Sequence, residues 1–248
     1  MSRLLIALAA LASLSGCVGW GADVQYWRPD LDASLRVSDG GIPGDLVNLQ
    51  RNLDVDRDED VPVECFWFQV GPSRYELGHW AMSAAGYGNP NISFNFGGSA
   101  YAVTDEVDSQ FDVDVWRLAY LFSPKLGKFK IGIGGALQWW DVEAVLENVT
   151  QGFTEDFDES YPIPAITARL EVPIGLFVSA FAETDWIDAE IGDIEGSFTD
   201  IRAGVRVAAP KGFSAMAGYR IVTADVEVDG DTADFEFDGV VFSLAVGF

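Results

Sequence analysis

The chain has few of the side chains that most often carry chemistry. Its 248 residues include one histidine, His79, and two cysteines, Cys17 and Cys65, so it lacks the cluster of histidines and cysteines on which a zinc site is built. Basic residues are scarce as well, because 15 Lys and Arg stand against 39 Asp and Glu, which gives a formal net charge of -24. Nucleic acid is therefore a poor partner, since phosphate binding needs a basic face.

Long apolar runs are also missing. After the N-terminal segment, no stretch offers the roughly 20 consecutive apolar residues that a membrane helix needs. The mean hydropathy is nevertheless +0.14, so apolar and acidic residues must be separated along the chain. We expect the apolar residues in strands and the acidic residues in loops. The 26 glycines and the 13% of aromatic residues are typical of a sheet protein with many tight turns.

Residues 1–16 have the pattern of a secretory signal peptide. Arg3 precedes an apolar run over 4–14, which is too short to cross a membrane as a helix. The segment ends in Leu14-Ser15-Gly16-Cys17, which resembles the lipobox of bacterial lipoproteins. The resemblance implies lipid attachment at Cys17 and a short anchor linker over 17–22. The alternative is an ordinary signal peptide with a chance cysteine.

From residue 23 to the end of the chain, alternating segments are separated by connectors. In the last segment, apolar residues alternate with mostly small ones. The apolar residues there are Val240, Phe242, Leu244, Val246 and Phe248. A period of two is typical of a strand with one apolar face. About ten such segments can be counted, and an even number of strands returns the C-terminus to the side on which the first strand begins.

The connectors between these segments alternate between two kinds. Short ones contain Pro, Gly or Lys, as in Gly71-Pro72-Ser73-Arg74, while long ones are acidic, as over 38–60, 147–159 and 188–195. Long loops at one end and short turns at the other are typical of a transmembrane barrel. We therefore predict an all-β fold over 23–248: a single up-and-down antiparallel transmembrane β-barrel of about ten strands, or of about eight. A soluble barrel or sandwich is the alternative.

Charged residues within the predicted strands gather on one face, where glycine, alanine and serine are also common. Both signs occur in similar numbers, which suits a narrow barrel interior, because an unpaired charge inside would be costly. We predict a lumen charge network of Arg28, Asp30, Asp32, Arg36, Arg117, Lys130, Arg169, Glu171, Glu183, Asp200, Arg202, Arg206 and Arg220.

The opposite, apolar face carries aromatic residues near the strand ends, as the interface girdles of membrane barrels do. One strand is irregular, because its alternation slips near Val113 to Val115, which predicts a β-bulge. The expected girdle residues are Trp27, Trp116, Tyr120, Trp139, Trp186 and Tyr219.

The signal peptide, the alternating strands and the terminal Phe248 resemble the small outer-membrane β-barrel proteins of Gram-negative bacteria. Segments such as Trp27-Arg28-Pro29-Asp30-Leu31 and Ala217-Gly218-Tyr219-Arg220 add to the resemblance, while the lipobox departs from it, since most such barrels are not lipoproteins. The resemblance implies a location in the bacterial outer membrane and contact with its lipids and lipopolysaccharide. It also implies that the outer-membrane insertion machinery reads Phe248.

Enzymatic chemistry has little support in the sequence. Barrels that resemble omptin proteases need acidic pairs and a histidine at the outer rim, and barrel lipases need a His–Ser pair. His79 lies in the middle of a predicted strand, in phase with Tyr75, Leu77 and Ala81, so we expect it to face lipid. No serine is placed for activation by this histidine, and a serine nucleophile needs such a base.

We therefore expect a non-enzymatic protein without cofactor or metal, with a structural or surface-interaction role and a lumen plugged by charged side chains. A narrow channel for small solutes or ions is the alternative. The acidic run Asp54, Asp56, Asp58, Glu59 and Asp60 offers the carboxylates that divalent cations prefer, but it lacks the glycine and spacing of a calcium loop. Divalent cations at the acidic loops are a possible partner.

Overall fold

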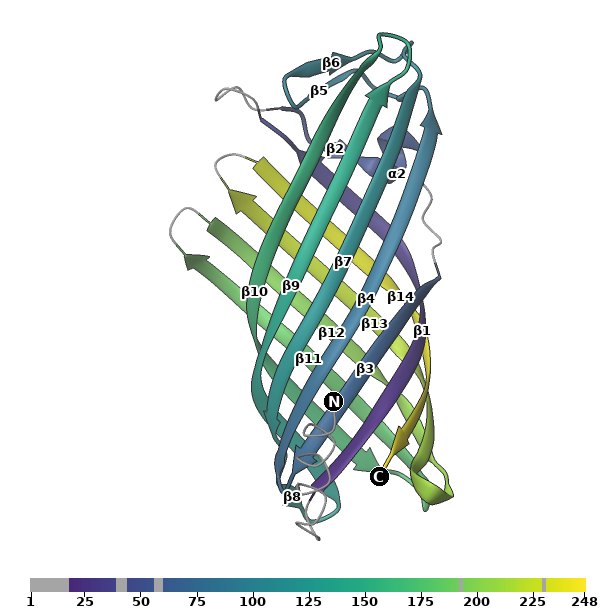
Figure 1. Cartoon of the computed structure of the whole chain (residues 1–248), viewed down its shortest axis with the longest axis vertical. Coiled ribbons are helices and arrows are strands. Elements are labelled where there is room, and N and C mark those ends of the chain that lie inside the picture. Colours follow the sequence, from purple (N-terminus) through teal and green to yellow (C-terminus); the bar gives the residue numbers. More distant parts are fainter. Residues whose placement is uncertain (1–17, 39–43, 56–59, 192–193, 229–230) are drawn as a thin grey trace, which may run out of the picture.

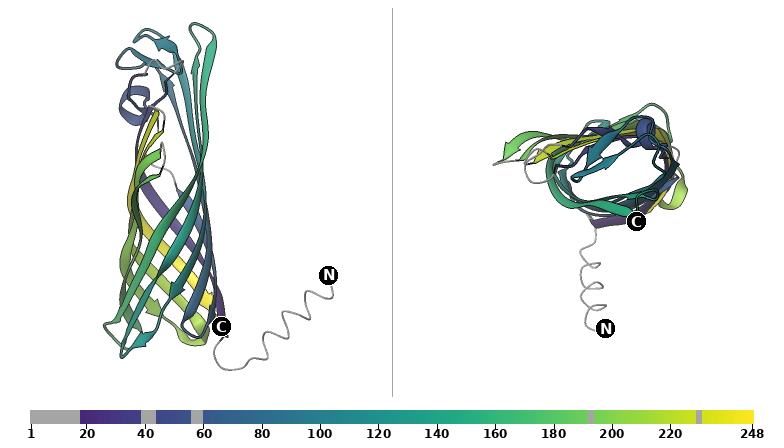
Figure 2. Two further views of the ribbon diagram at one scale, coloured as in Figure 1. Left: turned by 90° about the vertical axis from the view of Figure 1, so that its left-hand side faces the viewer. Right: turned by 90° about the horizontal axis from the view of Figure 1, so that it is seen from above.

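The computed structural model describes residues 18–38, 44–55, 60–191, 194–228 and 231–248. In this part of the chain, ten long strands form a closed antiparallel barrel (Figures 1 and 2). Each strand pairs with the next long strand in the chain, and β14 pairs with β1 to close the ring. The strands are β1 (Val18–Arg36), β3 (Val61–Val70), β4 (Ser73–Gly88), β7 (Val107–Phe122), β9 (Phe129–Asn148), β10 (Phe153–Pro173), β11 (Val178–Ile191), β12 (Ile194–Ala208), β13 (Phe213–Val228) and β14 (Asp231–Gly247).

The prediction of an all-β, up-and-down antiparallel barrel is therefore confirmed. The end that holds the C-terminus, which we call the lower end, has only short connections, including β8 (Lys125–Leu126) and the 3-10 turn η1 (Pro210–Gly212). The upper end carries β2 (Val47–Asn48), α2 (Leu49–Leu53), β5 (Phe94–Phe96) and β6 (Ser99–Tyr101) (Figure 1). No helix in the described ranges is long and apolar enough to cross a membrane.

The barrel begins earlier in the chain than the sequence predicts. Residues 18–22 were expected in an anchor linker, but they belong to β1, where Gly21 lies opposite Gly247 on one side and Trp67 on the other. This strand continues below Asp23 because both neighbouring strands offer pairing partners down to their lower ends. The predicted signal peptide, 1–16, and the predicted lipid attachment site, Cys17, lie outside the described residues.

Two acidic segments that were expected as loops are largely strand. Within 147–159, only the turn between Asn148 and Phe153 separates β9 from β10, and 188–195 contributes to both β11 and β12. Their acidic residues alternate with residues that face inward, as where Phe157 is buried and Asp158 is exposed. The connection 38–60 is long, as expected. Its Asp54 ends α2 with φ 56, while Asp56, Asp58 and Glu59 lie outside the described residues.

The two faces of a strand exchange their character partway up the barrel, as β7 shows. In its lower part the exposed outer residues are apolar, among them Trp116 and Leu118, and the inward residue between them is Arg117. In its upper part the outer face carries Asp112 and Asp114, and the inward residues are buried and, apart from Ser109, apolar. Pairing runs without a break along both neighbouring strands. The bulge predicted near 113–115 is therefore absent, and the apparent slip is this exchange.

The same exchange recurs around the barrel, so the lower half has an apolar outer surface and the upper half a charged one. We call the lower surface the apolar belt. Its exposed side chains include Val24, Tyr26, Phe66, Leu77, Trp116, Leu118, Tyr120, Phe122, Ile131, Ile133, Leu137, Trp139, Ile166, Leu170, Trp186, Ile201, Val205, Tyr219, Phe242 and Leu244. Charged residues that face outward above it include Arg28, Asp30, Asp32, Asp141, Glu143, Asp158, Asp188, Asp234 and Glu236.

Several acidic residues of the upper outer surface lie directly opposite each other on neighbouring strands. Glu143 of β9 faces Asp112 of β7 on one side and Asp158 of β10 on the other. Like charges in directly opposite positions destabilise a sheet. The upper barrel therefore carries electrostatic strain on its outer surface.

Replacing the central carboxylate should relieve this strain. We expect Glu143→Lys to raise the free energy of unfolding by about 0.5–1 kcal/mol, because two repulsive cross-strand pairs become attractive. The midpoint of guanidinium unfolding in detergent micelles measures the effect. Glu147→Lys is the matched control, since Glu147 faces Asp108 and the neutral Thr154 and should gain less. A loss of stability in Glu143→Lys alone would contradict this arrangement.

Candidate functional site

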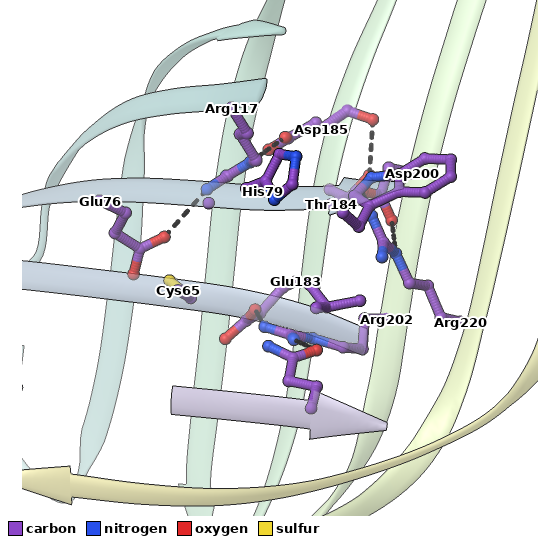
Figure 3. A pocket seen from close by; sticks show the side chains of 14 residues that line it. Cys65, Glu76, His79, Arg117, Glu183, Thr184, Asp185, Asp200, Arg202 and Arg220 are labelled. Atoms are coloured by element: carbon purple, nitrogen blue, oxygen red, sulfur yellow. Dashed lines mark hydrogen bonds and ion pairs between the residues drawn. The ribbon is translucent and has the colours of Figure 1, made fainter. Parts of the chain in front are cut away.

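Charged side chains fill the lower half of the barrel interior, and Glu76 of β4 connects many of them (Figure 3). This residue is only 3% exposed. Its carboxylate oxygens lie 2.6 Å from Arg74 Nε, 3.1 Å from Arg117 Nη1 and 2.7 Å from Arg169 Nη2. One carboxylate therefore serves guanidinium groups from β4, β7 and β10.

The arginines around Glu76 also contact acidic residues on other strands. Arg117 binds Asp185 at two points, with 2.6 Å from Nε to Oδ2 and 2.8 Å from Nη2 to Oδ1 (Figure 3). Because β7 and β11 are not neighbours in the sheet, this contact crosses the lumen. Arg169 Nε lies 2.7 Å from Glu183 Oε1, and Glu183 also pairs with Arg202.

Two further groups extend these contacts up and down the lumen. Above, Arg220 binds Asp200 at two points, at 3.0 Å and 2.8 Å. Below, Glu171 lies 3.1 Å from Lys130 Nζ and 3.3 Å from Arg206 Nη1. We call the whole set the lumen network: Arg74, Glu76, Arg117, Lys130, Arg169, Glu171, Glu183, Asp185, Asp200, Arg202, Arg206 and Arg220.

The charges of the lumen network can be buried because most of the carboxylates contact more than one basic side chain. A buried ion pair loses much of its attraction to the cost of desolvation, and removing one partner is then strongly unfavourable. Arginine keeps its charge under all ordinary conditions and binds carboxylates at two points. The interlocked side chains therefore plug the lower lumen.

Most of the predicted lumen charges lie in this network. The structure places the following predicted residues on the lumen side: Arg117, Lys130, Arg169, Glu171, Glu183, Asp200, Arg202, Arg206 and Arg220. Of these, Lys130 lies near the lower end of β9, and its side chain stays 57% exposed.

The four residues of β1 that were predicted to belong to the lumen network do not belong to it. Arg28, Asp30 and Asp32 are exposed on the outer face of the upper half, and Arg36 lies in the same alternating phase. Arg28 Nε is 3.8 Å from an Asp60 oxygen, and Asp32 pairs with Arg51 of α2. The prediction of a lumen position was wrong for these residues because polarity exchanges along β1, so its charged face points outward at their height.

The predicted set also missed important members, above all Arg74 and Glu76. Glu76 lies between the outward-facing Tyr75 and Leu77, so the period of two places it inside. This signal was present in the sequence. The three arginine contacts of Glu76 could not be inferred, since they depend on the curvature of the barrel.

The upper half of the interior is closed by apolar packing. Trp80 contacts Trp27, Trp140 and Phe237 with ring centroids 5.4 Å, 5.5 Å and 5.8 Å apart. We call these four residues the aromatic core. Trp27 was expected in the outer girdle, but it is fully buried, again because the faces exchange. The guanidinium of Arg220 lies 4.4 Å from the Trp27 ring and joins the lumen network to the aromatic core.

Little space remains between these two layers. A cavity of about 70 Å³ lies among lumen-network residues and Trp80 (Figure 3). This space admits water, since a cavity of about 10–15 Å³ is enough for one water molecule. Cys65, a free cysteine in this part of the chain, lines it as well.

His79 lines the outer side of this cavity (Figure 3), although it follows the outward phase of its strand. It faces outward in phase with Tyr75 and Leu77, where its Nε2 is 3.1 Å from Asp114 Oδ2 and its ring is 4.4 Å from the Trp116 ring. Among the described residues, no group of three or more His, Cys, Asp and Glu side chains is placed to hold a metal ion.

Phe248 lies on the outer surface at the lower end. Its ring is 4.9 Å from that of Trp20. The two residues also exchange backbone hydrogen bonds of 2.8 Å and 3.0 Å. The terminal residue is therefore fixed in the sheet, with its side chain on the apolar belt.

Removal of the charge on Glu76 should destabilise the barrel strongly. We expect Glu76→Gln to lower the free energy of unfolding by about 3–5 kcal/mol, because buried arginines lose a shared partner. Guanidinium unfolding measures the change. Glu64→Gln is the matched control, since Glu64 is exposed on the neighbouring strand. Equal effects of the two substitutions would argue against a connecting role for Glu76.

The sequence matches no protein-family model and no curated protein. The structure, however, is similar to outer-membrane β-barrels. The outer membrane protease OmpT from Escherichia coli matches with a TM-score of 0.55 and 9% identity, over 93% of this chain and 97% of that chain.

More distant matches include two further proteins. One is the Pseudomonas putida toluene transporter TodX, with a TM-score of 0.38, 9% identity and coverage of 97% of this chain and 92% of that chain. The other is Ail, the attachment invasion locus protein of Yersinia pestis, with a TM-score of 0.38, 9% identity and coverage of 92% and 99%. At 9% identity, the match to OmpT shows a shared barrel fold and no more.

Proposed function

We propose that the protein is a non-enzymatic β-barrel of the bacterial outer membrane, with a structural or surface-interaction role. Its lower half crosses the bilayer, and its upper half stands outside as an ordered surface. The observation that carries this proposal is the double closure of the interior, by the lumen network below and the aromatic core above.

The apolar belt supports the position in the membrane. On β9 it extends from Phe129 to Trp139, and on β14 from Val240 to the end of the chain. These lengths match the roughly 9–11 residues with which a tilted strand crosses a bilayer. A soluble barrel would instead carry its charges on this outer surface.

Aromatic residues at the upper margin of the belt give independent support. Trp116 and Trp139 lie opposite each other on β7 and β9, and Tyr219 of β13 binds Asp238 above it. Trp139 Nε1 donates to Asp141 Oδ1 at 3.1 Å. Tryptophan and tyrosine favour the membrane interface, where the ring meets hydrocarbon and the polar atom meets water.

The upper connections are held in place by packing and hydrogen bonds, which suits a surface for interaction. The rings of Phe94 and Tyr101 stack at 4.9 Å, and the Tyr101 hydroxyl donates to Leu146 O at 3.0 Å. Asp105 accepts hydrogen bonds from Ala102 N, Asn148 Nδ2 and Gln151 Nε2. These bonds favour the ionised form and hold the pKa of Asp105 below its usual value.

Catalysis has no comparable support. OmpT, whose fold is similar, is a protease. The only histidine of this chain, however, is on the outer face beside Asp114, below the upper rim. A general base must reach the proton that it removes, and His79 faces outward, where its Nε2 is paired with Asp114.

The same proposal includes the partners that a membrane position implies. Outer-membrane lipids and lipopolysaccharide surround the apolar belt, and Phe248 serves as the signal for the insertion machinery. The acidic outer surface would need divalent cations between it and lipopolysaccharide phosphates, because carboxylates and phosphates repel each other.

Conductance distinguishes this function from the alternative, a narrow channel. We expect no single-channel current when the protein is inserted in planar bilayers, because both halves of the lumen are filled. The double variant Glu76→Ala with Arg117→Ala is the informative control. It opens the lower layer and leaves the aromatic core in place, so it should also stay closed. Discrete current steps from the unmodified protein would favour the channel.

A further inference from the structure

The barrel wall is incomplete between β10 and β11. Their pairing runs only from Ile166 opposite Trp186 down to Pro173 opposite Ser179. Above this point β10 continues to Phe153 and pairs with β9 alone, while β11 pairs with β12 alone. Figure 1 shows the result, since the hairpins β11–β12 and β13–β14 lean away from β9 and β10. The upper wall therefore has a lateral opening.

Two prolines explain why the strands separate there. Pro162 and Pro164 have no N–H to donate, yet the ladder between β10 and β9 runs past both without interruption. In an antiparallel ladder, alternate residues direct their backbone groups to opposite neighbours. The missing donors therefore face β11, and the β10 edge cannot form a regular ladder on that side.

An apolar pocket lies in the opening. Its volume is about 410 Å³, well above the roughly 150 Å³ of a cavity that binds benzene and within the range of small-ligand sites. Because it is lined from both faces of the wall, it connects the outside with the barrel interior. Its walls include the outward-facing Leu137, Pro162 and Pro164 and the inward-facing Ile163, Ile187 and Phe198.

The height of the pocket indicates what surrounds it. Its lower margin lies at Leu137 and just above Ile166 and Trp186, which are exposed members of the apolar belt. Above it, the outer face of β10 becomes acidic at Asp158, and on β11 Asp188 lies beside the pocket, between the lining residues Ile187 and Ala189. The pocket thus opens where the hydrocarbon of the bilayer would end, a position that rests on the proposed function.

We infer that this pocket binds one acyl chain of a bilayer phospholipid, which enters sideways between β10 and β11. The apolar lining favours a hydrocarbon, because its burial is favourable and no polar group has to be desolvated. A partner β-strand on the β10 edge is disfavoured, since the two prolines deny it donors. The acidic residues beside and above the opening, Asp188 and Asp158, disfavour an anionic headgroup, so the lipid is a zwitterionic one.

Photolabelling tests this inference in the intact chain. The protein is reconstituted in phosphatidylcholine vesicles that carry a diazirine near the end of one acyl chain, and labelled residues are mapped by mass spectrometry. We expect label on Ile163, Ile187 and Phe198, which face inward beside the opening. Val113 and Val142 face inward where the wall is closed and are 1% exposed, so they should stay unlabelled.

Two variants that replace an alanine of β11 by phenylalanine form a test and its matched control. Ala189→Phe fills the pocket and should lower the label on the inward residues by about tenfold or more, because the ring takes the space that the acyl chain would occupy. Ala182→Phe adds the same ring to the outer face of β11 and should leave the label unchanged. Label on Leu118 in both variants shows that the barrel is still folded in the bilayer.

The outcomes separate the two proposals. Label on the apolar belt without label on the inward residues would overturn the acyl-chain pocket and leave the membrane barrel standing. No label on the belt would overturn the membrane position itself. Label on Val113 and Val142 as well would show a generally loose wall and contradict a specific lateral site.

Discussion

A strand of a closed barrel keeps one face inside and one outside along its whole length, although its two ends meet different media. In hydrocarbon the outer face must be apolar, and charges are tolerated only inside and paired. In water the outer face can be charged, and the interior must supply the packing. Each strand that continues from one medium to the other must therefore exchange the polarity of its faces, as β7 does between Asp114 and Trp116.

The two closures of the lumen follow from this exchange. Where the outer face is apolar, the charged residues turn inward and connect through Glu76, Arg117 and Glu183. Where the outer face is charged, the apolar residues turn inward and meet around Trp80. Arg220 stacks on Trp27 at the junction. A barrel built in this way is filled at both heights, which fits a structural or binding role better than transport through the lumen.

Sequence reasoning predicted the strands and their alternation, because a period of two is a local property. It could not tell which face points inward at a given height. Arg117 lies close to the lower turn after Phe122, and its lumen position was predictable, whereas Arg28 lies far above the start of β1 at Val18. With β1 expected to begin at Asp23, that distance was underestimated, and Arg28, Asp30 and Asp32 were assigned to the wrong side.

Two features depend on how the strands are staggered around the ring. They are the contacts across the lumen and the gap beside β10. Pro162 and Pro164 are visible in the sequence, but only the pairing of β9 with β10 reveals that their missing donors face β11. For the same reason, the pairing of Arg117 with Asp185 follows from closure of the barrel and from no local pattern.

Spin labels on the outer face of one strand test most directly whether that face passes from hydrocarbon into water. Leu118 and Asp112 both face outward on β7, and each can carry a nitroxide through a single cysteine in a chain whose Cys17 and Cys65 are serine. In vesicles, we expect the label at residue 118 to collide with oxygen and to be shielded from a water-soluble nickel chelate, and the label at residue 112 to do the reverse. Equal access of the nickel chelate to both labels would contradict a bilayer around the lower half.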